Sequence, residues 1–192
     1  MLRKVTKCFC VLFLSIAVMF AIPKYPLIYI GLLCGTLGDF LLLFKKRVIL
    51  FVFGVIFFML NHTLCITQVL IYIAPLTVAQ WIIIGSIMLI AYVGGLVFSL
   101  KFLKKKRRAI PASFYVFALF ANIIAYSSAS LLGYYAYFMI CIFGAISFLI
   151  SDMMLAYSLF VSGTKQSRHL VMGSYLIAQF LIALGFMMTF IG

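Results

Sequence analysis

Residues 26–44 read PLIYIGLLCGTLGDFLLLF, an apolar run of membrane-spanning length with one carboxylate, Asp39, inside it. A helix needs about 20 apolar residues to cross the hydrocarbon core of a bilayer. A second apolar run, residues 134–161, holds Asp152, and the chain has no other acidic residue. An ionisable side chain at membrane depth costs at least ~2.5 kcal/mol, so each aspartate is a candidate functional residue.

The composition extends this pattern to the whole chain. Of its 192 residues, 68% are hydrophobic and 9% are charged, whereas a soluble domain is roughly half apolar. We therefore predict an all-α, polytopic integral membrane bundle that forms a single domain over residues 1–192. The predicted spans are Val5–Ile22, Pro26–Phe44, Val48–Ala74, Leu76–Leu100, Ile110–Leu132, Tyr134–Val161 and Leu170–Ile191.

Basic residues lie at alternate ends of these blocks. All Lys and Arg except Lys24 fall near the N-terminus, where Lys7 is inside the first block, or between blocks two and three, four and five, or six and seven. Because cytoplasmic loops carry the excess of Lys and Arg, the pattern predicts seven helices with the N-terminus inside and the C-terminus outside. The net charge of +13 is then a mark of topology in a cytoplasmic membrane, and no nucleic-acid partner is predicted.

Small residues accompany both aspartates. Gly31, Gly35 and Gly38 precede Asp39, and Ser147 and Ser151 precede Asp152. Small residues let helices approach closely in lipid. The spans predict depths of about 8 Å for Asp39 and about 12 Å for Asp152 from the cytoplasmic helix ends. We expect their two helices to touch, so that the carboxylates share a polar cavity.

Other polar residues also lie inside predicted spans. His62 and Asn61 are in the middle of the third block, where no water satisfies them. His62 is either a hydrogen-bonded structural residue or a functional one. Interhelical hydrogen bonding is the simpler reading for three amides. Four tyrosines could give hydrogen bonds or cation–π faces, and an interfacial belt is the simpler reading for them. The amides are Gln68, Asn122 and Gln179, and the tyrosines are Tyr115, Tyr126, Tyr157 and Tyr175.

The five cysteines match no zinc-binding spacing, and we predict neither a metal nor an organic cofactor. The sequence also lacks the nucleophile motif of serine hydrolases, the paired-histidine motif of metalloproteases and a P-loop.

Four short motifs resemble the YhhN family, which includes bacterial and animal lysoplasmalogenases. The motifs are Leu37-Gly38-Asp39-Phe40-Leu41-Leu42, Phe53-Gly54 through Asn61-His62, Gly144-Ala145 with Phe148 and Ser151-Asp152, and Tyr175 with Gln179. They occur in the family's order over residues 31–182. Two features depart from the family: Cys65 stands where a tyrosine is frequent, and family members are usually described with eight spans, so eight helices are the alternative to seven.

The resemblance implies hydrolysis of the vinyl ether bond of a lysoplasmalogen, giving a fatty aldehyde and a glycerophospho-ethanolamine or -choline. Asp39 and Asp152 would be the catalytic pair, with support from His62, Asn61, Ser151, Tyr175 and Gln179. The implied partners are a lysophospholipid, water and membrane lipids. The basic run of Lys45, Lys46 and Arg47 is adjacent to Asp39 and could contact the lipid phosphate, although a topological role is simpler.

The chemistry suits two carboxylates. Vinyl ether hydrolysis passes through an oxocarbenium ion, and glycosidases meet a related problem with two carboxyl groups in different protonation states. A pair in lipid is expected to share one proton. Two other classes stay open: a proton-coupled transporter that uses the same aspartates as a relay, and a membrane scaffold in which they only pack.

Overall fold

The computed structural model describes residues 2–44, 47–73, 77–102, 106–131, 136–160 and 165–191. These residues are almost entirely helical, with no strand in any of the six ranges. The helices are α1 (Leu2–Ala21), α2 (Pro26–Leu42), α3 (Val48–Ile73), α4 (Val78–Phe102), α5 (Lys106–Leu131), α6 (Phe138–Phe160) and α7 (Lys165–Ile191). The predicted all-α class is therefore confirmed, and each helix covers one predicted block.

Local sequence explains the helix ends. Pro26 occupies the first turn of α2, where its missing N–H and fixed φ cost nothing. At the other end, α2 stops at Leu42 and not at the predicted Phe44. Asp39 is therefore about 4.5 Å from the helix end, closer than the predicted 8 Å.

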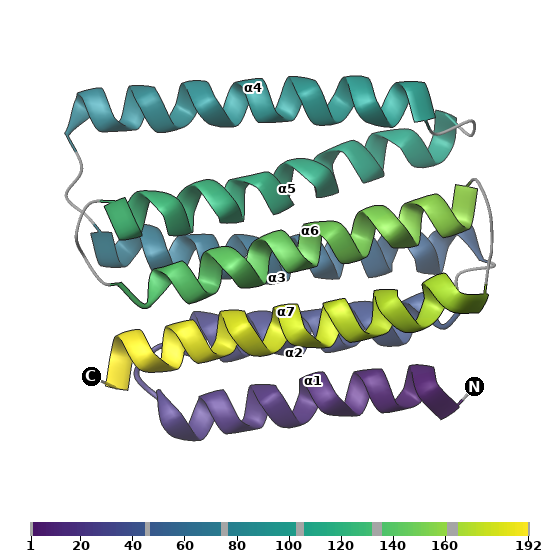
Figure 1. Ribbon diagram of the computed structural model, residues 1–192, viewed down its shortest axis with the longest axis horizontal. Coiled ribbons are helices and arrows are strands. Elements are labelled where there is room, and N and C mark those ends of the chain that lie inside the picture. Colours follow the sequence, from purple (N-terminus) through teal and green to yellow (C-terminus); the bar gives the residue numbers. More distant parts are fainter. Residues whose placement is uncertain are drawn as a thin grey trace.

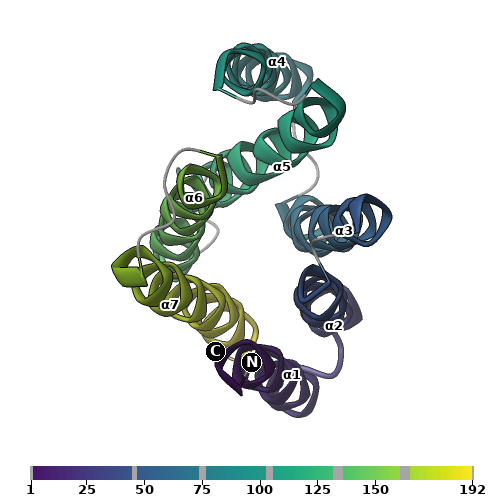
Figure 2. The same ribbon diagram turned by 90° about the vertical axis from the view of Figure 1, so that its right-hand side faces the viewer.

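Six of the helices form a closed ring. Each packs on its neighbour in the order α1, α2, α3, α5, α6, α7 and back to α1, whereas α4 packs on α5 outside the ring. Figure 2 shows the ring end-on, with α4 apart from it. The two aspartate helices, α2 and α6, which we expected to touch, are not adjacent in the ring and lie across its interior from each other.

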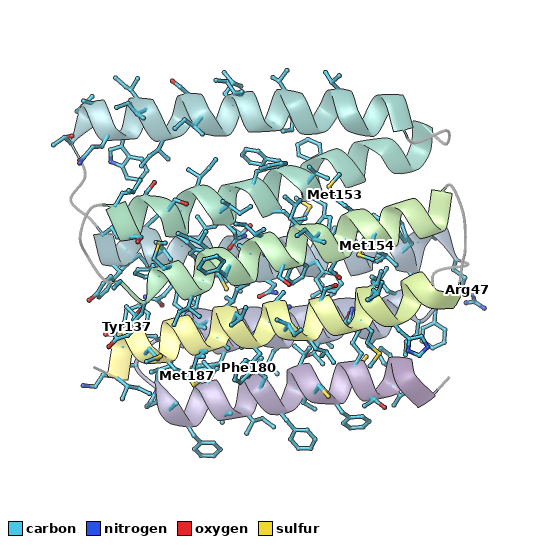
Figure 3. All side chains as sticks on the ribbon, in the orientation of Figure 1. Arg47, Tyr137, Met153, Met154, Phe180 and Met187 are labelled. Atoms are coloured by element: carbon cyan, nitrogen blue, oxygen red, sulfur yellow. The ribbon has the colours of Figure 1, made fainter. Side chains whose placement is uncertain are left out.

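The two ends of the bundle differ. The N- and C-termini lie at opposite ends (Figure 1). Arg47 projects from the end that holds the N-terminus, and Tyr137 lies at the other end (Figure 3). The helix ends that flank the three basic segments between blocks all share the end of Arg47, as the charge alternation predicts.

Four helices contain segments long and apolar enough to cross a membrane: Ile49–Ile73, Phe114–Leu131, Phe138–Leu155 and His169–Ile191. Shorter apolar segments lie in the other three, at Val5–Ala21, Pro26–Leu42 and Val78–Gly94. Large apolar side chains such as Phe20, Ile49 and Ile90 are exposed on the outer surface. A surface of this kind fits a lipid environment.

Candidate functional site

Asp39 lies inside the ring with three linked donors. The residue is buried, and the Lys7 ammonium from α1 lies 2.5 Å from Oδ1. The Tyr175 hydroxyl from α7 donates a hydrogen bond of 2.8 Å to Oδ2. Gln179, one turn further along α7, donates from Nε2 to the Tyr175 oxygen at 3.2 Å. A carboxylate with a cation on one oxygen and a hydroxyl on the other satisfies the requirements for burying a charge.

Lys7 joins three helices at this level. Its ammonium lies 3.3 Å from the centre of the Tyr175 ring, within the range of a cation–π contact. The Lys7 side chain is 22% exposed while that of Asp39 is 3% exposed. Lys7 therefore connects α1 to both of its ring neighbours, α2 and α7, at the buried carboxylate.

Asp152 has a different environment. It is partly buried on α6, and the Tyr115 hydroxyl from α5 donates to its Oδ2. Lys7 and Asp39 are both close enough to interact with Asp152 electrostatically. The ring therefore holds two carboxylates at one polar site, each with its own tyrosine, and only Asp39 has a cation in direct contact in the described part of the chain.

An aromatic wall connects the two tyrosines. The Phe58 ring lies edge-on to both Tyr115 and Tyr175, with centroid distances of 6.2 Å in each case. Phe148 packs against Tyr175 at 5.1 Å and against His62 at 4.8 Å. These rings place apolar surface beside the carboxylates, and electrostatic interactions are stronger in an apolar environment.

His62 brings an unsatisfied polar atom to this wall. Its side chain is 3% exposed, and its ring lies 6.0 Å from that of Tyr115. Within the described ranges, Nε2 has no hydrogen-bond partner. Buried polar atoms in proteins nearly always have a partner, so His62 Nε2 is a candidate binding atom for water or a substrate hydroxyl.

Asn61 and Ser151 have packing roles. A Cβ on Gly31 would lie 3.0 Å from Asn61 Oδ1, so the small residues of α2 face Asn61 on α3. The Ser151 hydroxyl donates to the Val171 carbonyl at 2.9 Å, and the Ser147 hydroxyl donates to the Ser174 carbonyl at 3.1 Å. These serines join α6 to α7, and Ser151 does not point its hydroxyl at either carboxylate.

The structure thus brings together Asp39, Asp152, Tyr175 and Gln179, with His62 on the adjoining wall. Sequence reasoning did not assign two residues of this site, Tyr115 and Lys7. It favoured an interfacial belt over a hydrogen-bonding role for Tyr115, and it counted Lys7 only as a topological charge. One signal for Lys7 was present, because it is the one basic residue inside a predicted span. The predicted roles of Lys45 and Lys46, and the side chain of Tyr157, lie outside the described part of the structure.

The opposite end of the ring is filled by aromatic side chains. Tyr126, Phe138 and Phe186 are fully buried and pack together with centroid distances of 5.7–6.4 Å. Phe190 extends this stack to Tyr25 and Tyr72, at 3.9 and 4.9 Å. The polar site is therefore covered on that side by packed apolar rings.

A groove of about 450 Å³ between α4 and α5 is lined by Gly85, Leu89, Tyr92, Phe114 and Phe117. It lies outside the ring and contains no carboxylate, imidazole or amine. Within the described ranges, no three His, Cys, Asp or Glu side chains are grouped so that they could hold a metal ion. The ring interior is therefore the candidate site.

A helical bundle with apolar outer faces and two internal carboxylates defines a polytopic membrane protein with a polar site between its helices. The chain belongs to the YhhN family, whose model matches residues 2–186. Comparison with curated proteins and with solved structures gives no match.

Proposed function

We propose that this protein is a membrane hydrolase that cleaves the vinyl ether bond of a lysoplasmalogen. All seven helices lie in the bilayer in this proposal, with the Arg47 end of the bundle on the cytoplasmic side. The observation that carries the proposal is the pair of tyrosine-bound carboxylates, Asp39 and Asp152, inside one helical ring. Membership of the YhhN family is consistent with a membrane hydrolase.

The reaction uses the pair in sequence. One aspartic acid transfers its proton to the β-carbon of the vinyl ether, and the π electrons form the new C–H bond. The positive charge then spreads over the α-carbon and the ether oxygen, where the second carboxylate stabilises it. Water adds to the α-carbon and returns a proton to the first carboxylate. The hemiacetal next loses its hydroxyl proton as the C–O bond to glycerol breaks, and the glycerol oxygen gains a proton. The products are an aldehyde and an alcohol.

The surrounding residues suit this chemistry. Phe58 and Phe148 provide an apolar wall for the hydrocarbon part of the substrate. His62 Nε2, buried and without a protein partner in the described ranges, is positioned to hold the attacking water. Arg47 is exposed at the end of the bundle that holds the N-terminus, where it is placed to contact a lipid phosphate.

Proton-coupled transport is the rival proposal for the same aspartates. Transport requires the polar path to reach both sides of the membrane. The aromatic stack around Tyr126, Phe138 and Phe186 lies across the far side of the ring. These packed side chains offer no polar path to that side in the described part of the chain, which favours the hydrolase.

The deciding experiment is aldehyde release from a lysoplasmalogen by the purified protein in detergent. We expect release by the wild type and at least a 100-fold loss in Asp39→Asn and in Asp152→Asn, because acid–base groups contribute about 10²–10⁴-fold. Lys24→Gln is the matched control, since Lys24 is exposed at the opposite end of the bundle.

The saturated 1-alkyl lysophospholipid is the control substrate. It should release no aldehyde, because it lacks the double bond that accepts the proton. No release by folded wild-type protein across ethanolamine and choline head groups would contradict the hydrolase. Proton flux in vesicles without product, abolished by the same Asn substitutions, would support transport instead.

A further inference from the structure

Lys7 makes the two carboxylates of the ring unequal. Asp39 accepts from the Lys7 ammonium at 2.5 Å and from the Tyr175 hydroxyl at 2.8 Å. Asp152 accepts from the Tyr115 hydroxyl, a neutral donor. An adjacent cation favours the charged form of a carboxyl group, and a second carboxylate nearby disfavours it. Lys7 acts on both carboxyl groups but most strongly on Asp39, which it contacts directly, whereas each carboxylate disfavours charge on the other.

We propose that Lys7 is the positioning residue that holds Asp39 ionised, so that Asp39 is the permanent anion of the site and Asp152 carries the exchangeable proton. The division of charge follows from contacts alone. The roles of anion and acid in vinyl ether cleavage rest, in addition, on the proposed function.

The other groups around Asp39 do not offset this effect. From α1, Cys8 interacts with Asp39 electrostatically, in addition to Lys7. Tyr175 on α7, Tyr115 on α5 and Asp152 on α6 are the other titratable groups that interact with it. From α3, the residues that meet the glycines of α2 are Gly54, Phe58, Asn61 and Cys65. Cys65 is the one of these four that titrates, and a thiol supplies no positive charge in either protonation state. Lys7 is therefore the one cation among the described groups that face Asp39.

Geometry also fixes the orientation of the ammonium. The Tyr175 ring lies 3.3 Å below Lys7 Nζ, and the Phe58 ring lies 5.9 Å from it. Two aromatic faces and one carboxylate oxygen hold the cation between α1, α2 and α7. The same tyrosine that supports Lys7 with its ring donates its hydroxyl to Asp39, so the anion, the cation and Tyr175 form one unit.

On the Asp152 side, Tyr115 occupies Oδ2. Oδ1 is then the oxygen that can carry the transferable proton toward a substrate in the ring. After proton transfer, Asp152 becomes negative beside Asp39, and the oxocarbenium ion and Lys7 together balance the two charges. The site passes through the reaction without leaving an unpaired charge in an apolar interior.

The chain offers an unusually clean test, because Asp39 and Asp152 are its only acidic residues. Infrared spectroscopy distinguishes the C=O stretch of a protonated carboxyl group from the stretches of a carboxylate. In Asp152→Asn, Asp39 is the sole remaining acidic side chain, so the pH titration of the spectrum reports Asp39 directly. The C-terminal carboxylate is common to all variants and subtracts out.

We expect Asp39 to be ionised at neutral pH in Asp152→Asn. In the double variant Lys7→Gln/Asp152→Asn, the carboxylate should protonate at a pH about 1–3 units higher, the usual effect of removing one adjacent opposite charge. The wild type should show one protonated carboxyl group that Asp152→Asn removes. A protonated Asp39 in the presence of Lys7, or a titration that Lys7→Gln does not move, would overturn the proposal.

The spectrum requires no substrate, so its outcome is separate from that of the proposed function. Where the wild type releases aldehyde, the pH profile of kcat adds a second readout. Lys7→Gln should move the acidic limb to higher pH with KM little changed, and Lys7→Arg should restore most of the profile because it retains the cation. A raised KM with an unmoved profile would assign Lys7 to substrate binding and overturn the positioning role.

A Lys7→Gln chain that does not fold still leaves a decisive comparison. The wild type, Asp152→Asn and Lys7→Arg/Asp152→Asn report the charge states with a cation at position 7 in every case. Ionised Asp39 in the two Asp152→Asn backgrounds, with one protonated carboxyl in the wild type, supports the proposal. Two carboxyl groups in the same protonation state in the wild type overturn it.

Discussion

Each carboxylate of the ring has its own tyrosine, and the two tyrosines are not equivalent. Tyr175 is one of two donors to Asp39, and its hydroxyl is itself supported by Gln179. Tyr115 is the one donor to Asp152 within the described residues. Loss of the Tyr115 hydroxyl therefore removes all of the hydrogen bonding that the structure shows for Asp152, whereas Asp39 keeps Lys7 when Tyr175 loses its hydroxyl.

This difference predicts that Tyr115→Phe reduces kcat more than Tyr175→Phe. Asp152 becomes charged as it gives up its proton, and a hydrogen bond to a charged group contributes about 1.5–3 kcal/mol, which corresponds to about 10-fold to 100-fold in the rate for Tyr115→Phe. The measurement is aldehyde release beside the thermal unfolding midpoint in the same detergent. A larger kinetic loss in Tyr175→Phe, with both variants equally stable, would contradict this ranking.

At the scale of helices, close packing depends on glycines at specific contacts. A Cβ added at Gly144 of α6 would lie 2.9 Å from the Ile182 backbone nitrogen and 3.0 Å from the Ala178 carbonyl oxygen of α7. Backbone atoms cannot move aside without shifting the whole helix. Gly173 of α7 is different, because a Cβ there would meet nothing within 4 Å.

We therefore expect Gly144→Ala to destabilise the protein by about 1–3 kcal/mol, the usual cost of overpacking. The matched control, Gly173→Ala, should be neutral or stabilising by up to about 1 kcal/mol, because alanine is the better helix former. Unfolding midpoints of both variants in one detergent give the comparison. Equal midpoints for the two variants would show that α6 and α7 do not pack as closely as the structure places them.

At the scale of the whole molecule, the arrangement of the helices and the positions of the basic residues predict how the bundle is oriented in the membrane. The termini lie at opposite ends of the bundle, and the helix ends beside the basic segments share the end of the N-terminus. Cytoplasmic loops carry the excess of Lys and Arg. The polar site lies nearer this end, since Asp39 is three residues from the end of α2.

This predicts that a reporter fused to the C-terminus lies outside the cell, and that a single added cysteine at Lys24 is labelled by an impermeant thiol reagent. A cysteine at Arg47 should resist the same reagent until the membrane is opened. The five native cysteines are replaced first by alanine or serine, with aldehyde release as the check on folding. Labelling of the cysteine at Arg47 and not of the one at Lys24 would show that the orientation in the membrane is opposite to the predicted one.

The sequence by itself determined the helices, because apolar length and the interrupting Pro, Gly and basic residues are local properties of the chain. It also identified Asp39, Asp152, Tyr175 and Gln179, because an ionisable or polar side chain inside a long apolar run is conspicuous without any coordinates. It favoured contact between the helices of the two aspartates, whereas α2 and α6 are not adjacent in the ring.

Only the tertiary structure decided that the carboxylates meet across a ring of six helices, with α4 outside it. Only the tertiary structure placed Lys7 on Asp39 and Tyr115 on Asp152, partners that are 32 and 37 positions away in the chain. Lys7 reads as a topological charge and Tyr115 as an interfacial aromatic until their helices are packed. The physical reason is that the partner of a charge in lipid is set by which helices pack against it. Positions in the sequence do not indicate which helix that will be.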